Sequence, residues 1–223
     1  KELEENLVFL RPLGLRLAAN IVAKKTGFAG QTCVNYNRIY VQERIYPQLC
    51  EKVAEKLRAV KLGRWKDEGQ VMGPLINKKA RDRMLELVDD AVKSGAKLVM
   101  GGEVPEDFAK GAYMTPALLV DVTDDMRVSK EEIFGPILPM LTFDRLQEAI
   151  DFIRGREKPL ALYLFTSDRA AERQVLGSCS FGGGCINDTI IHLATTHMPF
   201  GGVGNSGMGS YHGKKSFDTF THE

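Results

Sequence analysis

The chain has 223 residues, of which 43% are hydrophobic and 26% charged, and its formal net charge is +1. This length suits one α/β domain or two small ones, and the apolar fraction is sufficient for a hydrophobic core. The near-neutral charge argues against nucleic acid or a membrane surface as partner, and no apolar run approaches the ~20 residues that span a bilayer.

In the first half, apolar residues recur at helical spacing and alternate with short β-branched or apolar runs. The predicted helices cover residues 15–25, 44–61 and 78–94, the last with Asn77 as its N-cap, and the predicted strands cover residues 38–42, 97–100 and 113–122.

The second half continues the alternation of strands and helices. Strands are predicted at residues 137–143, 160–165 and 183–190, and helices follow the first two of them. Asp144, with Gln147 three residues later, resembles a capping box for the first of these helices. The alternation predicts an α/β fold class, with a three-layer parallel sheet covered by helices on both faces.

The four cysteines (Cys33, Cys50, Cys179 and Cys185) are too few for a disulfide framework in a chain of this length. No signal peptide is recognisable, so the sequence favours a reducing, cytoplasmic location. Residue 1 is Lys and not Met, and we therefore expect the chain to begin inside a longer gene product.

One glycine-rich pattern and one pair of histidines resemble binding motifs but do not meet their requirements. Residues 202–207 match G-x-G-x-x-G, but no predicted strand precedes them and no acidic residue can follow at the required distance, so a glycine-rich turn is favoured. His192 and His197 are five residues apart, and no cysteine pair has zinc spacing. We predict no metal site.

Two polar segments are candidates for chemistry. Cys33 ends the tetrapeptide Gly30-Gln31-Thr32-Cys33 in a polar loop, where it is either a small buried hydrophobe or a nucleophile. The other three cysteines lie beside apolar stripes or turns and are interpreted as structural. Glu131 and Glu132 precede Ile133-Phe134-Gly135-Pro136, and such a pair is either solvated or able to bind a ligand's hydroxyl groups.

These residues resemble motifs of the aldehyde dehydrogenase superfamily, and the resemblance runs from about Leu15 to His222. The matching segments are Gly30–Cys33, Met72–Leu75, Glu131–Pro136, Lys158–Tyr163 and Pro199–Gly207. The first half is similar to semialdehyde dehydrogenases. From Arg156 onward, including Tyr211–Phe220, the sequence is similar to class 3 and fatty aldehyde dehydrogenases.

The resemblance implies a mechanism in which the Cys33 thiolate adds to an aldehyde, hydride passes to NAD or NADP, and the resulting thioester is hydrolysed to a carboxylic acid. It implies that the Cys33 amide stabilises the developing oxyanion, that Glu132 binds the nicotinamide-ribose hydroxyls and that Phe134 packs near the nicotinamide. The aldehyde is the implied partner, and a homo-oligomer is expected for the full-length enzyme.

Three departures qualify this resemblance. The family's dinucleotide-binding domain precedes the cysteine and is almost entirely absent here. The family's general base lies in a Glu-Leu-Gly-Gly motif, whereas Glu2-Leu3-Glu4-Glu5 has acids in place of both glycines and is closer to the cysteine, so Glu2 is an imperfect match for the base. Many relatives have a glutamate four positions after the Ser-Gly of the tail, whereas this chain has Tyr211 there, as class 3 enzymes do. In addition, the family's oligomerisation strand would follow the last residue of this chain.

We therefore expect a divergent segment at residues 1–14, a catalytic domain at 15–205 and a tail at 206–223. The leading hypothesis is the catalytic domain of an NAD(P)+-dependent aldehyde dehydrogenase, without turnover as an isolated chain. The alternative is a degenerate or truncated homologue that associates with a partner. A third hypothesis is residual thiol esterase activity, which would need Cys33 but no cofactor.

Overall fold

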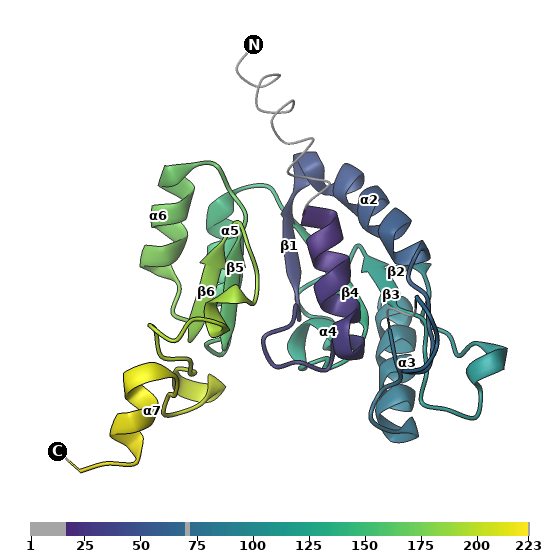
Figure 1. The fold of residues 1–223 in the computed structure, drawn as a ribbon. Coiled ribbons are helices and arrows are strands. Elements are labelled where there is room, and N and C mark those ends of the chain that lie inside the picture. Colours follow the sequence, from purple (N-terminus) through teal and green to yellow (C-terminus); the bar gives the residue numbers. More distant parts are fainter. Residues whose placement is uncertain (1–16, 70–71, 223) are drawn as a thin grey trace. The chain divides into compact units, whose positions relative to one another are not determined.

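The structure, a computed structural model, describes residues 17–69 and 72–222, and the chain divides into two compact units. The first unit ends at Asp144 and the second begins at Arg145. Figure 1 labels the helices and strands of both units. This boundary falls inside the span 15–205 that the sequence predicts as one catalytic domain, and that three-part division remains a prediction. Each unit is described by itself below.

The first unit is built on a four-stranded sheet. Its strand order is β1 (Ile39–Gln42), β4 (Ile137–Phe143), β3 (Ala117–Val120) and β2 (Lys97–Met100). β1 and β3 both pair with β4 in parallel, with Ile39 opposite Met140 and Ala117 opposite Ile137. The first five residues of β4 are all buried, as expected for a central strand covered on both faces.

One strand departs from the predicted parallel sheet. β2 pairs with β3 in antiparallel orientation, with Lys97 opposite Val120. The connection from β2 to β3 contains only the short 3-10 helix η3 (Glu106–Phe108) and no crossover α-helix. Parallel neighbours need such a crossover, so this loop instead produces an antiparallel edge strand.

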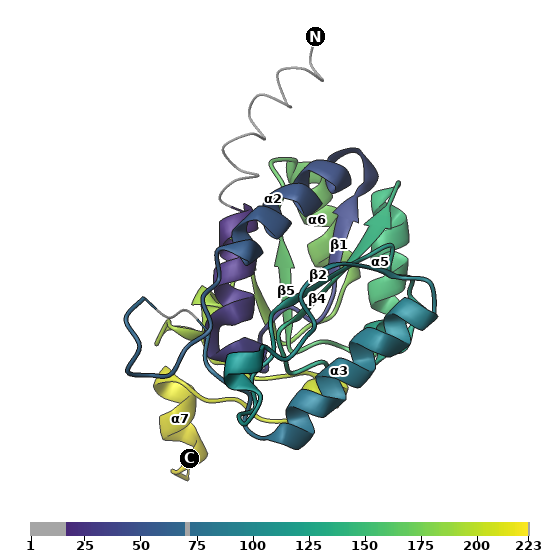
Figure 2. The ribbon, with the colours of Figure 1, turned by 90° about the vertical axis from the view of Figure 1, so that its right-hand side faces the viewer.

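Helices cover both faces of this sheet. α3 (Lys78–Lys93) contributes buried residues to one cluster with alternate residues of β3 and β4: Met84, Leu87, Val88, Ala91, Ala117, Leu119, Ile137 and Leu141. α2 (Tyr46–Arg58) contacts a residue on the opposite face of β4: the Cys50 Sγ lies 3.8 Å from the Met140 Sδ. Successive strand residues point to opposite faces, so α2 and α3 lie on opposite sides of the sheet (Figure 2). The predicted three-layer α/β architecture is confirmed.

The remaining elements of the first unit are short, apart from a helix over residues 17–26. They are η1 (Gly27–Gly30), η2 (Glu43–Ile45) and α4 (Arg127–Lys130). Asn77 caps α3 as predicted, since its side-chain oxygen accepts a hydrogen bond of 2.8 Å from the Ala80 amide.

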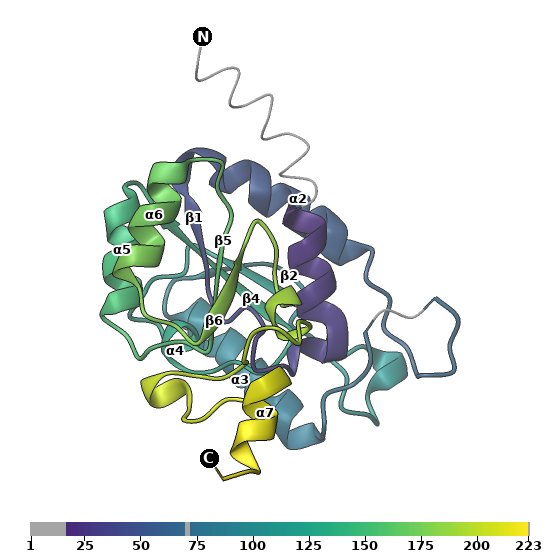
Figure 3. The same ribbon diagram turned by 60° about the vertical axis from the view of Figure 1, so that its left-hand side comes forward.

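The second unit contains a strand–helix–strand motif. β5 (Ala161–Leu164) and β6 (Gly183–Ile186) pair in parallel, and α6 (Arg169–Ser178) connects them. Figure 3 shows α6 beside α5 (Leu146–Arg154), next to this strand pair. The buried centre of the unit comprises Ile150, Val175 and Cys179.

The start of α5 differs from the predicted capping box. The N-cap is Arg145 and not Asp144, and the carboxylate of Glu148 accepts hydrogen bonds from the Arg145 backbone amide and side chain. The prediction was one residue early because both registers offer a polar residue followed three positions later by Gln or Glu.

The chain after β6 is mostly irregular. It contains η4 (Ile191–Leu193), η5 (Gly204–Ser206) and α7 (Gly213–Thr219). The G-x-G-x-x-G match therefore forms a single 3-10 turn, as the sequence predicts, and not a strand-to-helix phosphate loop. Within residues 17–69 and 72–222, no helix is long and apolar enough to cross a membrane.

Candidate active site

The loop that carries Cys33 begins with an unusual backbone conformation. Phe28, Ala29 and Gly30 have successive φ angles of 51°, 53° and 74°, a left-handed region that non-glycine residues rarely enter. This segment ends the helix over residues 17–26 and turns the chain towards β1. Cys33 follows in a hydrogen-bonded turn and is exposed, with a free thiol. The structure therefore excludes the buried-hydrophobe interpretation of this cysteine.

Gly30 and Gly135 join two of the sequence motifs. A Cβ atom placed on Gly30 would lie 2.2 Å from the carbonyl oxygen of Gly135, far inside van der Waals contact. Gly135 in turn is closely covered by the Met84 side chain of α3, at 2.1 Å from its ideal Cβ position. The close approach of two backbones brings the Cys33 loop against the turn that contains Glu132 and Phe134.

Gln31 links the same loop to a third motif. Its side-chain oxygen accepts a hydrogen bond of 2.8 Å from the Ile76 amide, and its amide nitrogen contacts the Pro74 carbonyl at 3.5 Å. Pro74 belongs to the Met72–Leu75 segment that resembles the family. Three segments distant in sequence therefore converge on one loop.

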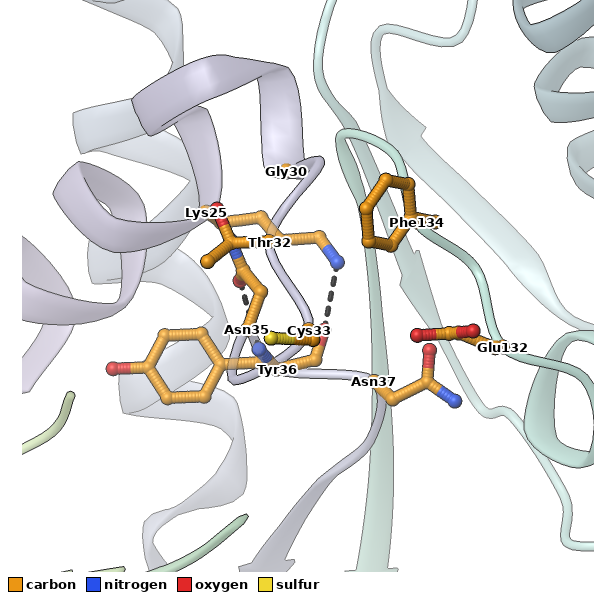
Figure 4. Close-up of a pocket in the computed structure, with 9 residues that line it drawn as sticks. All are labelled: Lys25, Gly30, Thr32, Cys33, Asn35, Tyr36, Asn37, Glu132 and Phe134. Carbon is orange, nitrogen blue, oxygen red and sulfur yellow. Dashed lines mark hydrogen bonds between the residues drawn. The ribbon is translucent and has the colours of Figure 1, made fainter. Parts of the chain in front are cut away.

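A small pocket lies between the Cys33 loop and the turn that contains Glu132 and Phe134. Its lining consists of Lys25, Gly30, Thr32, Cys33, Asn35, Tyr36, Asn37, Glu132 and Phe134 (Figure 4). The structure thus brings together three predicted site residues, Cys33, Glu132 and Phe134. The fourth, Glu2, lies outside the described residues.

The structure separates the roles of the two adjacent glutamates. The Glu131 carboxylate forms ion pairs with Arg127 and, at 3.0 Å, with Arg83, and these partners hold the pKa of that carboxyl below its usual range. The Glu132 side chain lines the pocket, and its carboxylate has no hydrogen-bond or ion-pair partner within residues 17–69 and 72–222. Of these two glutamates, Glu132 is the one that lines the pocket without a carboxylate partner among the described residues.

Phe134 presents an aromatic surface to the pocket. It is 46% exposed and has a φ angle of 52°, so its backbone is held in a conformation that is unfavourable for a bulky residue. Positive φ at Phe134 and the tight packing at Gly135 place the ring outside the hydrophobic core. An exposed aromatic ring beside an unpaired carboxylate suits a ligand with one flat and one hydroxylated part.

Lys25 is a pocket residue that the sequence analysis did not identify. It is buried, with 1% of its surface exposed, and its Nζ donates a hydrogen bond of 2.7 Å to the Tyr36 carbonyl (Figure 4). Burial lowers the pKa of this ammonium group to about 7. In the sequence it is one of two adjacent lysines in the last turn of a predicted helix, a common position for solvated basic residues.

The other cysteines lie in less accessible surroundings. Burial raises the pKa of the Cys50 thiol to about 11, and burial likewise raises the pKa values of Cys179 and Cys185. A raised pKa leaves little thiolate at neutral pH, which makes these three poor nucleophiles. In the part of the chain that the structure describes, no three His, Cys, Asp or Glu side chains are grouped as a metal site requires.

Comparison with known proteins identifies the family to which the chain is similar. Residues 15–223 match the model of the aldehyde dehydrogenase family. The chain is 48% identical over 195 residues to 4,4'-diaponeurosporen-aldehyde dehydrogenase from Staphylococcus aureus, covering 87% of this chain and 41% of that protein. It is 42% identical over 195 residues to aldehyde dehydrogenase family 3 member H1 from Arabidopsis thaliana, covering 87% of this chain and 39% of that protein.

The fold is also similar to solved structures of this family. A structure described as the substrate-bound state of Staphylococcus aureus AldH aligns with a TM-score of 0.83 and 44% identity, over 94% of this chain and 44% of that chain. The chain therefore spans less than half the length of these relatives. On the match over residues 15–223 and on these similarities, the chain belongs to the aldehyde dehydrogenase family.

Proposed function

We propose that this chain provides the nucleophile-bearing part of an NAD(P)+-dependent aldehyde dehydrogenase, which oxidises an aldehyde to a carboxylic acid. The observation that carries the proposal is the pocket in which the exposed Cys33, the unpaired Glu132 carboxylate and the Phe134 ring occur together. Membership of the family supports the reaction class. The remainder of the cofactor site is proposed to come from a dinucleotide-binding segment outside this chain.

Cys33 is the proposed nucleophile. Its thiolate would attack the aldehyde carbon, forming a C–S bond while the carbonyl oxygen takes up negative charge. The Cys33 backbone amide would donate a hydrogen bond to that oxygen, an interaction that is strongest when the charge is greatest. Loss of a hydride from the same carbon, for which bound NAD(P)+ would be the acceptor, would leave a thioester. Water would then cleave this thioester, releasing the carboxylic acid and regenerating the thiol.

Glu132 and Phe134 are the proposed cofactor contacts, and their surroundings fit this role. A carboxylate without a protein partner can accept hydrogen bonds from both hydroxyls of a ribose, and an exposed aromatic ring can pack on a nicotinamide. Bound NAD(P)+ would supply the acceptor for the hydride that leaves the substrate carbon. Glu2 is the proposed general base for the hydrolytic step, from the match to the family's motif.

NAD(P)H formation, followed by absorbance with aliphatic, aromatic and semialdehyde substrates, tests this proposal. We expect any reduction to be abolished by Cys33→Ala and to be unaffected by Cys179→Ala, a matched change at a buried thiol. Reduction that persists in Cys33→Ala would contradict the assignment of the nucleophile.

Hydrolysis of p-nitrophenyl acetate provides a second readout that needs no cofactor. If the chain alone lacks NAD(P)H formation, as expected when most of the cofactor site is elsewhere, Cys33-dependent ester hydrolysis would still support the acyl-transfer role. Absence of both activities, with normal folding, would instead favour a non-catalytic homologue that associates with a partner.

A further inference from the structure

The backbone around Glu132, from the end of the short helix α4 to Ile133, is held by many side-chain hydrogen bonds. Five successive carbonyl groups, those of Ser129, Lys130, Glu131, Glu132 and Ile133, each accept a hydrogen bond from a side chain. All five donors belong to three residues, Asn37, Arg38 and Arg83. Irregular segments with few backbone hydrogen bonds open easily, and these five bonds therefore restrict the movement of the segment around Glu132.

Asn37 makes the most specific of these contacts. Its Nδ2 donates to the Glu131 carbonyl at 2.9 Å, and its Oδ1 accepts from the Ile133 amide at 2.8 Å. The two bonds bracket Glu132, so one side-chain amide fixes the peptide groups before and after it. Both hydrogen-bonding functions of the amide are used, which sets the orientation of the Asn37 side chain.

Arg83 and Arg38 hold the same segment from two other elements. Arg83 of α3 donates to the Glu132 carbonyl at 2.7 Å and to the Ile133 carbonyl at 2.8 Å. Arg38, which immediately precedes β1, donates to the carbonyls of Ser129 and Lys130. The backbone of Glu132 is therefore held by two independent parts of the first unit, while its carboxylate has no partner in the part of the chain that the structure describes.

Asn37 follows the proposed nucleophile by only four residues. Between them, the Lys25 ammonium group binds the Tyr36 carbonyl and the Asn35 side chain binds the Lys24 carbonyl at 2.9 Å. The segment that follows Cys33 is thus attached to the helix over residues 17–26 through Asn35 and Tyr36, and to the backbone around Glu132 through Asn37. These attachments begin two residues after the thiol and limit the movement of its loop relative to the Glu132 turn.

We propose that Asn37 and Arg83 are positioning residues that hold Glu132 in the orientation required for cofactor binding and couple its position to Cys33. This inference rests on the proposed function of Glu132. Neither residue needs to touch the cofactor or the aldehyde. Loss of either would allow the Glu132 backbone to rotate, and displacement of a binding group by about 1 Å can cost up to 100-fold in activity.

Amide hydrogen exchange of the chain without cofactor tests directly whether Asn37 and Arg83 hold the backbone around Glu132. In Asn37→Ala, we expect the Ile133 amide to exchange at least about tenfold faster, because the Asn37 oxygen that accepts its hydrogen bond is lost. Asn37→Asp keeps an oxygen acceptor and should restore most of the protection. Arg81→Met is the matched control, since Arg81 also lies on α3 and binds a carbonyl, that of Gly111.

Cofactor binding tests the coupling to function. In Asn37→Ala and Arg83→Met, we expect the dissociation constant for NAD+, measured from NMR shifts of residues 131–134, to rise about tenfold. In Arg83→Met, a change at a residue that is not part of the pocket lining, Cys33-dependent hydrolysis of p-nitrophenyl acetate should stay within about twofold of wild type, since it does not use Glu132. A merely destabilising change would alter both.

The outcomes separate the two proposals. An unchanged exchange rate of the Ile133 amide in Asn37→Ala would overturn the inference that Asn37 holds the backbone around Glu132, whether or not the enzyme oxidises aldehydes. Faster exchange with an unchanged NAD+ dissociation constant would overturn its role in positioning Glu132. No NAD+ binding by the wild-type chain, with the exchange result as expected, would contradict the proposed cofactor role of Glu132. It would still establish that Asn37 holds the backbone around Glu132.

Discussion

The α-carbon of Gly30 lies so close to Gly135 that a Cβ atom at Gly30 would be 2.2 Å from the Gly135 carbonyl oxygen. Gly30 also has a φ angle of 74°, which is accessible to glycine at little cost. The nucleophile loop and the Glu132 turn therefore meet through backbone atoms, and a side chain at this point would separate them.

Gly30→Ala should destabilise the protein by roughly 2–4 kcal/mol, from backbone strain and from overpacking against Gly135. It should also slow alkylation of Cys33 or ester hydrolysis by moving the loop. Urea unfolding and a hydrolysis assay would measure the two effects. Gly27→Ala is the matched control, because nothing lies within 4 Å of its ideal Cβ position, and its effect should stay within about 0.5 kcal/mol.

Iodoacetamide at pH 7.5 should modify Cys33 before the other cysteines. Cys33 is exposed, whereas burial raises the pKa values of Cys50, Cys179 and Cys185 and reduces their thiolate fractions. Peptide mass spectrometry over a time course would give the four rates, with Cys33→Ser as the control. Equal labelling of all four thiols in the native protein would contradict the exposed-nucleophile assignment.

Lys25 should make stability depend on pH above neutrality. Its pKa is about 7 in the folded chain, against 10.5 for a free lysine, so the unfolded chain binds more protons between these values. The free energy of unfolding should therefore rise with pH in this window, by at most about 1.4 kcal/mol per pH unit from this group.

Lys25→Met should lose this contribution, so wild type gains stability relative to the variant between pH 7 and pH 9.5. Urea unfolding at several pH values would measure the difference, and Lys24→Met, at the exposed neighbouring lysine, is the control. If the free energy of unfolding changes with pH in the same way for wild type and Lys25→Met across this range, the ammonium group keeps its charge despite burial.

Glu131 and Glu132 should respond differently to the same substitution. Glu131→Gln removes ion pairs with Arg127 and Arg83 at a partly exposed site, so it should lower stability by up to about 1 kcal/mol. These partners lower the pKa of Glu131, so the difference should disappear as acid protonates the wild-type carboxylate.

Glu132→Gln should leave stability within about 0.5 kcal/mol of wild type, because its carboxylate has no partner within the described residues. It should weaken NAD+ binding, which Glu131→Gln should affect less. Unfolding curves and NAD+ titrations of the two variants make the comparison. A large loss of stability in Glu132→Gln would indicate a structural role instead.

Local sequence patterns predicted most of the elements and part of the site. Strand β4 occurs at residues 137–143 as expected, and Asn77 caps α3, because both depend on residues within a few positions of each other. The orientation of β2 was not predictable, since it depends on the length and conformation of a loop and on pairing with β3. The sequence predicted a capping box near residue 145 but not its register, because Asp144 with Gln147 and Arg145 with Glu148 have the same spacing.

The sequence by itself determined that this protein has an α/β fold and which motifs it shares with the aldehyde dehydrogenase family, because apolar periodicity and short motifs are encoded by neighbouring residues. Only the tertiary structure decided which glutamate is free, where Lys25 is buried and which side chains hold Glu132. These features depend on hydrogen bonds and close contacts between residues as many as 96 positions apart, as from Ile133 to Asn37. No local pattern specifies such contacts, since they exist only when the sheet and its covering helices bring the segments together.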